Sequence, residues 1–215
     1  MTNPIDVLVL EDRPADAELM VHELEKAGYD VAATRVETMD DLLAALHGEP
    51  DLILADYTLP GFTAEAVLEA LRARKSGVPV IIVSGTIQEE KAVECMRLGA
   101  VDYILKDRLA RLGPAARAAL DAKAERVRRR VAEEELARSK RHVLADAVYT
   151  RDRIGSLARI FGAALATGES IADVQEWPGR IQEITATEVQ AVARKYLTPE
   201  RSVTGYLVGA PGGRT

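Results

Sequence analysis

The chain has 215 residues, a net charge of −6, 47% hydrophobic residues and 29% charged residues, values that are ordinary for a globular protein. The mild acidity argues against non-specific nucleic-acid binding by the whole molecule, and the single cysteine, Cys95, excludes an intrachain disulfide framework. No signal-peptide pattern and no apolar stretch of the roughly 20 residues needed to cross a bilayer is present, so we expect a cytoplasmic protein without a membrane partner.

Short apolar runs alternate with amphipathic segments of helical length. The runs predict strands at residues 5–10, 52–55, 78–83 and 101–105, and a further strand is expected at residues 31–36. The segments between the strands predict helices at residues 14–27, 38–48, 63–75 and 87–98, with a fifth helix from about residue 108. The run Leu52–Ala55 has no polar residue, which is typical of a strand buried on both faces of a parallel sheet. This alternation predicts an α/β, flavodoxin-like, doubly wound fold with a five-stranded parallel sheet.

The second half of the chain has a different composition. Gly113-Pro114 is expected to interrupt or kink the fifth helix, and residues 115–147 are rich in strong helix formers. We interpret them as a signalling-type linker helix whose imperfect apolar seam suits a parallel coiled coil in a homodimer. The basic run Arg126–Arg130 is interpreted as a solvated helix face balanced by Glu133–Glu135, with contact to phosphates as the alternative.

The last residues predict short helices at 154–165, 171–177 and 185–197, with a capping box at Thr185–Glu188, and one strand at 202–208. A single strand needs a partner sheet. We therefore divide the chain into an α/β domain (1–122), a linker helix (123–145) and a mostly helical tail with one strand (146–215).

Polar side chains follow four of the predicted strands at the point where each strand ends. They are Glu11 and Asp12, Asp56, Ser84 with Gly85, and Lys106. Asp56 alone would be interpreted as a turn or helix-capping residue, and Ser84 alone as an ordinary polar residue at a strand end. Because the carboxyl ends of parallel strands meet at one edge of the sheet, their joint occurrence predicts a single site.

The chemistry of these residues suits phosphoryl transfer. Glu11, Asp12 and Asp56 would repel one another without a cation, and hard carboxylate oxygens suit Mg²⁺. Asp56, at the end of the central strand, is then the natural nucleophile. The hydroxyl of Ser84, the amides of Ser84 and Gly85, and the mobile charge of Lys106 can contact phosphoryl oxygens.

Together these residues resemble the receiver domains of two-component response regulators, over about residues 4–122. The resemblance implies that Asp56 is the phosphoacceptor, that a histidine kinase or phosphotransfer protein is the partner, and that the only catalysis is the protein's own phosphorylation and dephosphorylation. It further implies that Asp12, Asp56 and the Thr58 carbonyl bind Mg²⁺ with help from Glu11, that Ser84 and Tyr103 are switch residues, and that Lys106 is the essential lysine. One departure is Asp107, where receivers commonly have a proline, and this puts the usual cis peptide in doubt.

Residues 142–209 resemble the extreme C-terminus of insulinase/pitrilysin-like zinc peptidases. Segments such as Asp146–Asp152, Ala172–Ile181 and Ala193–Leu197 carry this second resemblance. The inverted His-x-x-Glu-His motif of that family does not occur, so we predict no peptidase activity. A docking module for a zinc-peptidase-like partner is the alternative function, and nucleic-acid binding through Arg126–Arg130 ranks last.

Overall fold

The computed structural model describes residues 3–86, 89–151 and 154–198. The chain divides into two compact units, Met1–Val127 and Arg128–Thr215, and each of them is described by itself.

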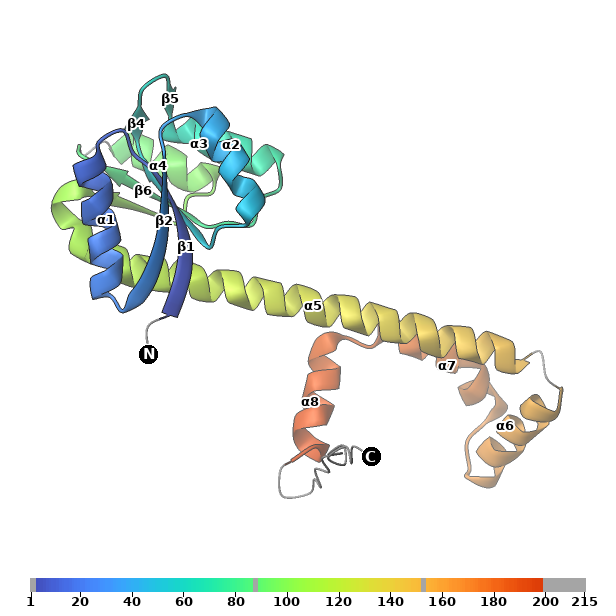
Figure 1. Ribbon diagram of the computed structural model, residues 1–215. Coiled ribbons are helices and arrows are strands. Elements are labelled where there is room, and N and C mark those ends of the chain that lie inside the picture. Colours follow the sequence, from blue (N-terminus) through green and yellow to red (C-terminus); the bar gives the residue numbers. More distant parts are fainter. Residues whose placement is uncertain (1–2, 87–88, 152–153, 199–215) are drawn as a thin grey trace, which may run out of the picture. The chain divides into compact units, whose positions relative to one another are not determined.

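The first unit is built on a five-stranded parallel sheet in the order β2-β1-β3-β6-β7 (Figure 1). The strands are β1 (Asn3–Leu10), β2 (Tyr29–Val36), β3 (Leu52–Asp56), β6 (Val80–Ser84) and β7 (Asp102–Leu105). This is the flavodoxin-like order of doubly wound sheets, and it confirms the predicted fold class. Leu10 pairs with both Val36 and Ala55, and Asp56 pairs with Val83, so the strands end together at one edge.

Helices cover both faces of this sheet. They are α1 (Pro14–Lys26), α2 (Met39–Ala45), α3 (Ala64–Ala73), α4 (Glu89–Leu98) and the first turns of α5 (Leu112–Arg151). Side chains of α1 and α5 pack with Val7, Val9 and Leu54 in one core, whereas α2, α3 and α4 pack with Leu8, Ile53 and Ile82 in the other. Neighbouring strand residues thus point to opposite faces of the sheet. Burial of each Leu or Ile side chain contributes about 1.5–3 kcal/mol to the free energy of unfolding.

Two local features near the sheet differ from the predicted elements. The helix expected over residues 38–48 is α2 followed by a 3₁₀ turn at Leu46–Gly48, after which Glu49 has a left-handed φ of 51°. After β3, the predicted turn at Pro60-Gly61 connects a small antiparallel hairpin of β4 (Thr58–Leu59) and β5 (Phe62–Thr63). Gly61 has a φ of 91°, the conformation that the third position of a type II turn requires.

The prediction that Gly113-Pro114 interrupts or kinks the fifth helix is wrong. A 3₁₀ helix at Lys106–Arg111 follows β7, and α5 begins only at Leu112, so Gly113 and Pro114 lie in its first turn. A proline there removes no intrahelical hydrogen bond, because the first amides of a helix have no partner inside it. From Leu112, α5 continues to Arg151 and passes both predicted boundaries of the linker.

The second unit contains α6 (Ile154–Ala166), α7 (Ile171–Glu183) and α8 (Ala186–Tyr196) in addition to the end of α5. Thr185 and Glu188 form the predicted capping box of α8. The helix expected to stop at Trp177 continues through Pro178 to Glu183, and the guanidinium of Arg180 donates to the Asp173 carbonyl at 2.8 Å.

The predicted strand at 202–208 lies outside the described residues. Over the described ranges, no helix is both long enough and apolar enough to cross a membrane.

Candidate functional site

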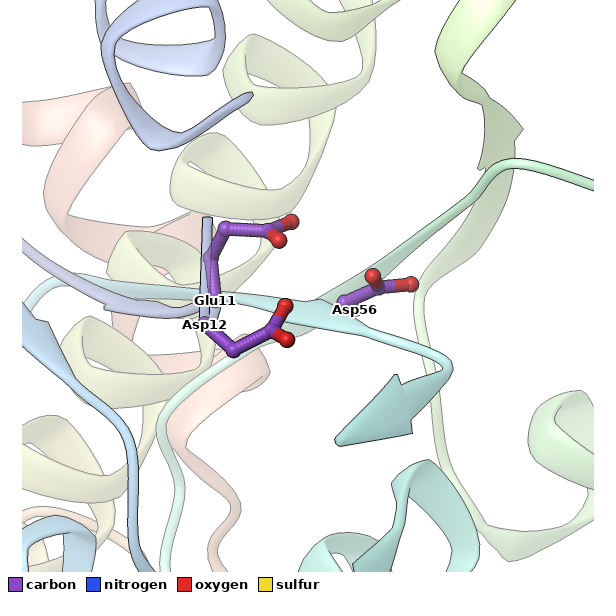
Figure 2. A group of neighbouring side chains, drawn as sticks. All are labelled: Glu11, Asp12 and Asp56. Carbon is purple, nitrogen blue, oxygen red and sulfur yellow. The ribbon is translucent and has the colours of Figure 1, made fainter. Parts of the chain in front are cut away.

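Three carboxylates meet at the edge where β1 and β3 end. Figure 2 shows Glu11 and Asp12, directly after β1, beside Asp56, the last residue of β3. One ligand oxygen from each of the three residues lies within 4.8 Å of the others. Glu11 is buried, Asp56 is partly buried and Asp12 is exposed, so one side of the group is open to solvent.

Lys106, directly after β7, reaches this group with its ammonium nitrogen. Its Nζ lies 2.7 Å from Glu11 Oε2, 2.9 Å from Asp56 Oδ2 and 2.7 Å from Asp16 Oδ2. Burial alone would lower the pKa of Lys106, but hydrogen bonds to Asp16, Glu11 and Asp56 outweigh it and raise the pKa above its ordinary value. Lys106 is therefore held as a cation among acids.

Asp16 was missed in the sequence, because it does not follow a strand. It lies in the first turn of α1, where the helix dipole favours an acidic residue. This position at the start of a predicted helix was the only sequence feature that could have drawn attention to Asp16. The hydrogen bond from Lys106 is the main reason that the pKa of Asp16 is lowered.

Glu11 is held from two sides. Its Oε1 accepts a hydrogen bond from the Arg13 amide at 3.1 Å, and its Oε2 accepts the one from Lys106. Burial raises the pKa of Glu11 in spite of these bonds. Arg35, also missed, donates to the carbonyls of Glu11 at 3.1 Å and Asp12 at 3.3 Å, and thereby fixes the turn that presents both acids.

These residues fit Mg²⁺. The donor set is made of hard carboxylate oxygens, which Mg²⁺ prefers, and it leaves one side exposed for water and a phosphoryl group. Burial of the Glu11 carboxylate raises its pKa, and a cation beside it would offset this cost of burying a charge.

The other predicted residues lie around the same edge. Ser84 is the buried last residue of β6, and its hydroxyl donates to the Thr86 carbonyl at 3.2 Å. The Tyr103 hydroxyl of β7 donates to the same carbonyl at 3.4 Å. Gly85 follows β6 and Thr58 begins β4, two residues after Asp56.

Tyr57 is a further residue that the sequence did not single out. It follows Asp56, its hydroxyl donates to Glu65 of α3, and its ring lies 6.5 Å from that of Tyr103. The ammonium group of Lys91, in α4, lies 4.5 Å from the centre of the Tyr57 ring. The residue next to Asp56 therefore contacts both α3 and α4.

No cis peptide bond occurs among the described residues, and the bond between Lys106 and Asp107 is trans.

The fold and this edge define a class of protein: a doubly wound α/β domain with an acidic group and a lysine at the carboxyl ends of its strands. The family model of the response regulator receiver domain matches residues 7–115, just over half of the chain. The chain belongs to this family, whose members are the receivers of two-component systems.

Relatives and solved structures agree with this assignment. The DNA-binding response regulator MtrA of Mycolicibacterium smegmatis is 34% identical over 100 residues, which are 46% of this chain and 43% of MtrA. The transcriptional regulatory protein BaeR of Escherichia coli is 34% identical over 109 residues, 48% of this chain and 44% of BaeR. The crystal structure of the receiver domain of a putative Luxo repressor protein from Vibrio parahaemolyticus is similar with a TM-score of 0.52 and 26% identity, and it covers 57% of this chain and 95% of that domain.

The matched region covers only part of this chain and only part of each relative. The chain spans less than half the length of MtrA and BaeR, and the family match ends at residue 115. It thus gives no support to the resemblance of the tail to zinc peptidases. MtrA is a DNA-binding response regulator, so the relatives do not support our ranking of nucleic-acid binding last.

Proposed function

We propose that this chain is a phosphoacceptor receiver, in which Asp56 takes a phosphoryl group from a histidine kinase or a histidine phosphotransfer protein. The observation that carries the proposal is the position of Lys106 Nζ, 2.9 Å from Asp56 Oδ2 and beside the carboxylates of Glu11 and Asp12. A nucleophilic carboxylate, a group of oxygen ligands for a metal ion and an ammonium group are the parts that phosphoryl transfer needs.

In the proposed reaction, an Asp56 carboxylate oxygen attacks phosphorus and forms the P–O bond of an acyl phosphate. The P–N bond to the donor histidine breaks, and its electron pair stays on the imidazole nitrogen, which takes up a proton. Mg²⁺, held by Glu11, Asp12, Asp56 and the Thr58 carbonyl, would neutralise charge on the phosphoryl oxygens.

The remaining residues contact the phosphoryl group. Lys106 follows the charge from the carboxylate to the phosphoryl oxygens, because its ammonium is a mobile point charge. The Ser84 hydroxyl exchanges the Thr86 carbonyl for a phosphoryl oxygen, and the Gly85 amide donates to another. Tyr103, which donates to the same carbonyl, then turns inward and changes the surface of α4, β7 and α5.

The test is incubation of the protein with acetyl phosphate and Mg²⁺, followed by mass measurement. We expect one phosphoryl group that base and hydroxylamine release, no labelling of Asp56→Asn, and wild-type labelling of Asp107→Asn, an exposed acid next to Lys106. Equal labelling of wild type and Asp56→Asn would rule out the proposal.

We further propose a cytoplasmic location and a homodimer formed through α5. The docking of the tail on a zinc-peptidase-like protein is not proposed, because the family match ends before the tail.

A further inference from the structure

The ammonium group of Lys106 has three protons and three carboxylate partners. The distances from Nζ to Glu11, Asp16 and Asp56 are 2.7, 2.7 and 2.9 Å, so each proton has its own acceptor. Two of these acceptors, Glu11 and Asp56, also belong to the group that fits a cation. Asp16 is the partner outside that group.

Asp16 is well placed to keep its contact. Its side chain is 17% exposed and lies in the first turn of α1, with Arg13 Nη1 3.6 Å from the same oxygen that binds Lys106. The Asp16 amide also donates to the Arg13 carbonyl at 3.1 Å, which anchors the residue at the helix start. Asp16 is therefore carried by the first turn of α1, whereas Asp56 is carried by the end of β3.

A cation bound by Glu11, Asp12 and Asp56 would compete with Lys106 for the oxygens of two of its partners. We propose that Asp16 is a positioning residue that keeps the ammonium group of Lys106 beside Asp56 while the other acids hold the cation. This inference rests on the proposed function and adds a residue to its machinery. The charge of Asp16 matters, because a hydrogen bond between two ions is roughly twice as strong as a neutral one.

The first test is independent of phosphorylation. Urea unfolding of wild type, Asp16→Asn, Lys106→Met and the double variant is measured in EDTA and again in Mg²⁺. We expect Asp16→Asn to raise the unfolding equilibrium constant about tenfold in wild type and not at all in the Lys106→Met background, in both solutions. An equal rise in both backgrounds would overturn the inference, and Lys106→Gln replaces Lys106→Met if the latter does not fold.

The second test uses the reaction. At saturating Mg²⁺, we expect Asp16→Asn to lower the rate constant for phosphorylation by acetyl phosphate about tenfold, Asp16→Glu to restore part of it, and Asp16→Asn to have no further effect in the Lys106→Met background. Glu18→Gln, an exposed acid on the same helix, is the matched control and should react like wild type.

The outcomes separate the two proposals. If wild type is not phosphorylated, the proposed function fails, and the unfolding cycle still decides whether Asp16 acts on Lys106. If wild type and Asp16→Asn are phosphorylated at the same rate, the proposed function stands and the role of Asp16 is refuted.

Discussion

Glu11 is a carboxylate with no exposed surface, and its charge depends on the ammonium of Lys106 at 2.7 Å. Lys106→Met would leave a buried carboxylate beside Asp16 and Asp56 without a countercharge. We expect the free energy of unfolding at about pH 7 to fall by about 3 kcal/mol, as for other broken buried ion pairs. Lys26→Met, which breaks an exposed pair with Glu23 on α1, should cost under about 1 kcal/mol.

The stability that Lys106→Met removes should decrease as the pH falls. Lys106 lowers the pKa of Asp16, so the ion pair stabilises the folded protein above the unfolded pKa of an aspartate and loses its effect as the pH falls. The difference in the free energy of unfolding between wild type and Lys106→Met should thus be constant near neutral pH and shrink as the pH falls below about 4. Urea unfolding at several pH values measures it, and a difference that grows toward acid would contradict the assigned pair.

Binding of Mg²⁺ to the three carboxylates should stabilise the folded protein. A ligand that binds only the folded state stabilises it by mass action, by about 2.7 kcal/mol at a concentration 100 times Kd. We therefore expect Mg²⁺ to raise the melting temperature relative to EDTA, and Asp12→Asn to lose most of this shift. Asp107→Asn should keep the full shift, and an undiminished shift in Asp12→Asn would show that the cation binds elsewhere.

The sequence predicts the residues of this site that follow strands, because the edge of a parallel sheet gathers its strand ends. It does not predict Asp16 or Arg35. Whether Asp16 turns toward Lys106 depends on the angle at which α1 leaves β1, and Arg35 lies inside β2, where only the pairing of β2 with β1 brings it to the Glu11 carbonyl. Both depend on tertiary packing rather than on a local pattern.

The close contact between α5 and the end of α1 requires a glycine at position 113. A Cβ on Gly113, in the first turn of α5, would lie 2.5 Å from the Cβ of Ala27, which cannot move away without its backbone. We expect Gly113→Ala to lower the free energy of unfolding by about 1–3 kcal/mol, although alanine favours helices. Gly162→Ala, in α6 with open space around the added methyl, should instead stabilise its unit by about 0.5–1 kcal/mol. Thermal unfolding followed by circular dichroism measures both, and a neutral or stabilising Gly113→Ala would show that the helices can move apart.

The wrong expectation for α5 came from its proline, Pro114. The rule that proline breaks helices depends on where the helix starts, and the start of α5 is set by Leu112, Ala116 and Ala119, which pack into the core. Pro114 therefore lies in a first turn rather than in a helix interior. Composition alone does not locate that start, whereas β1, β3, β6 and β7 were predictable because each contains a short run of apolar residues.

At the scale of the whole molecule, the core of the receiver unit is complete without the tail. Both buried clusters of the first unit are formed by residues between Ile5 and Leu120, and the chain divides after Val127. None of the residues of these two clusters comes from the second unit. The stability of the first unit should thus be independent of the second.

A truncated chain of residues 1–127 tests this independence. We expect it to unfold in one cooperative step with the midpoint of the receiver unit in the full chain, and to show the same Mg²⁺ shift and the same labelling of Asp56. A chain of residues 1–111 is the control, because it lacks the part of α5 that contributes Leu112, Ala116 and Ala119 to the core, and it should not fold. If residues 1–127 unfold at a lower midpoint than the full chain, the tail contributes to the receiver, and the division after Val127 does not separate two independent folding units.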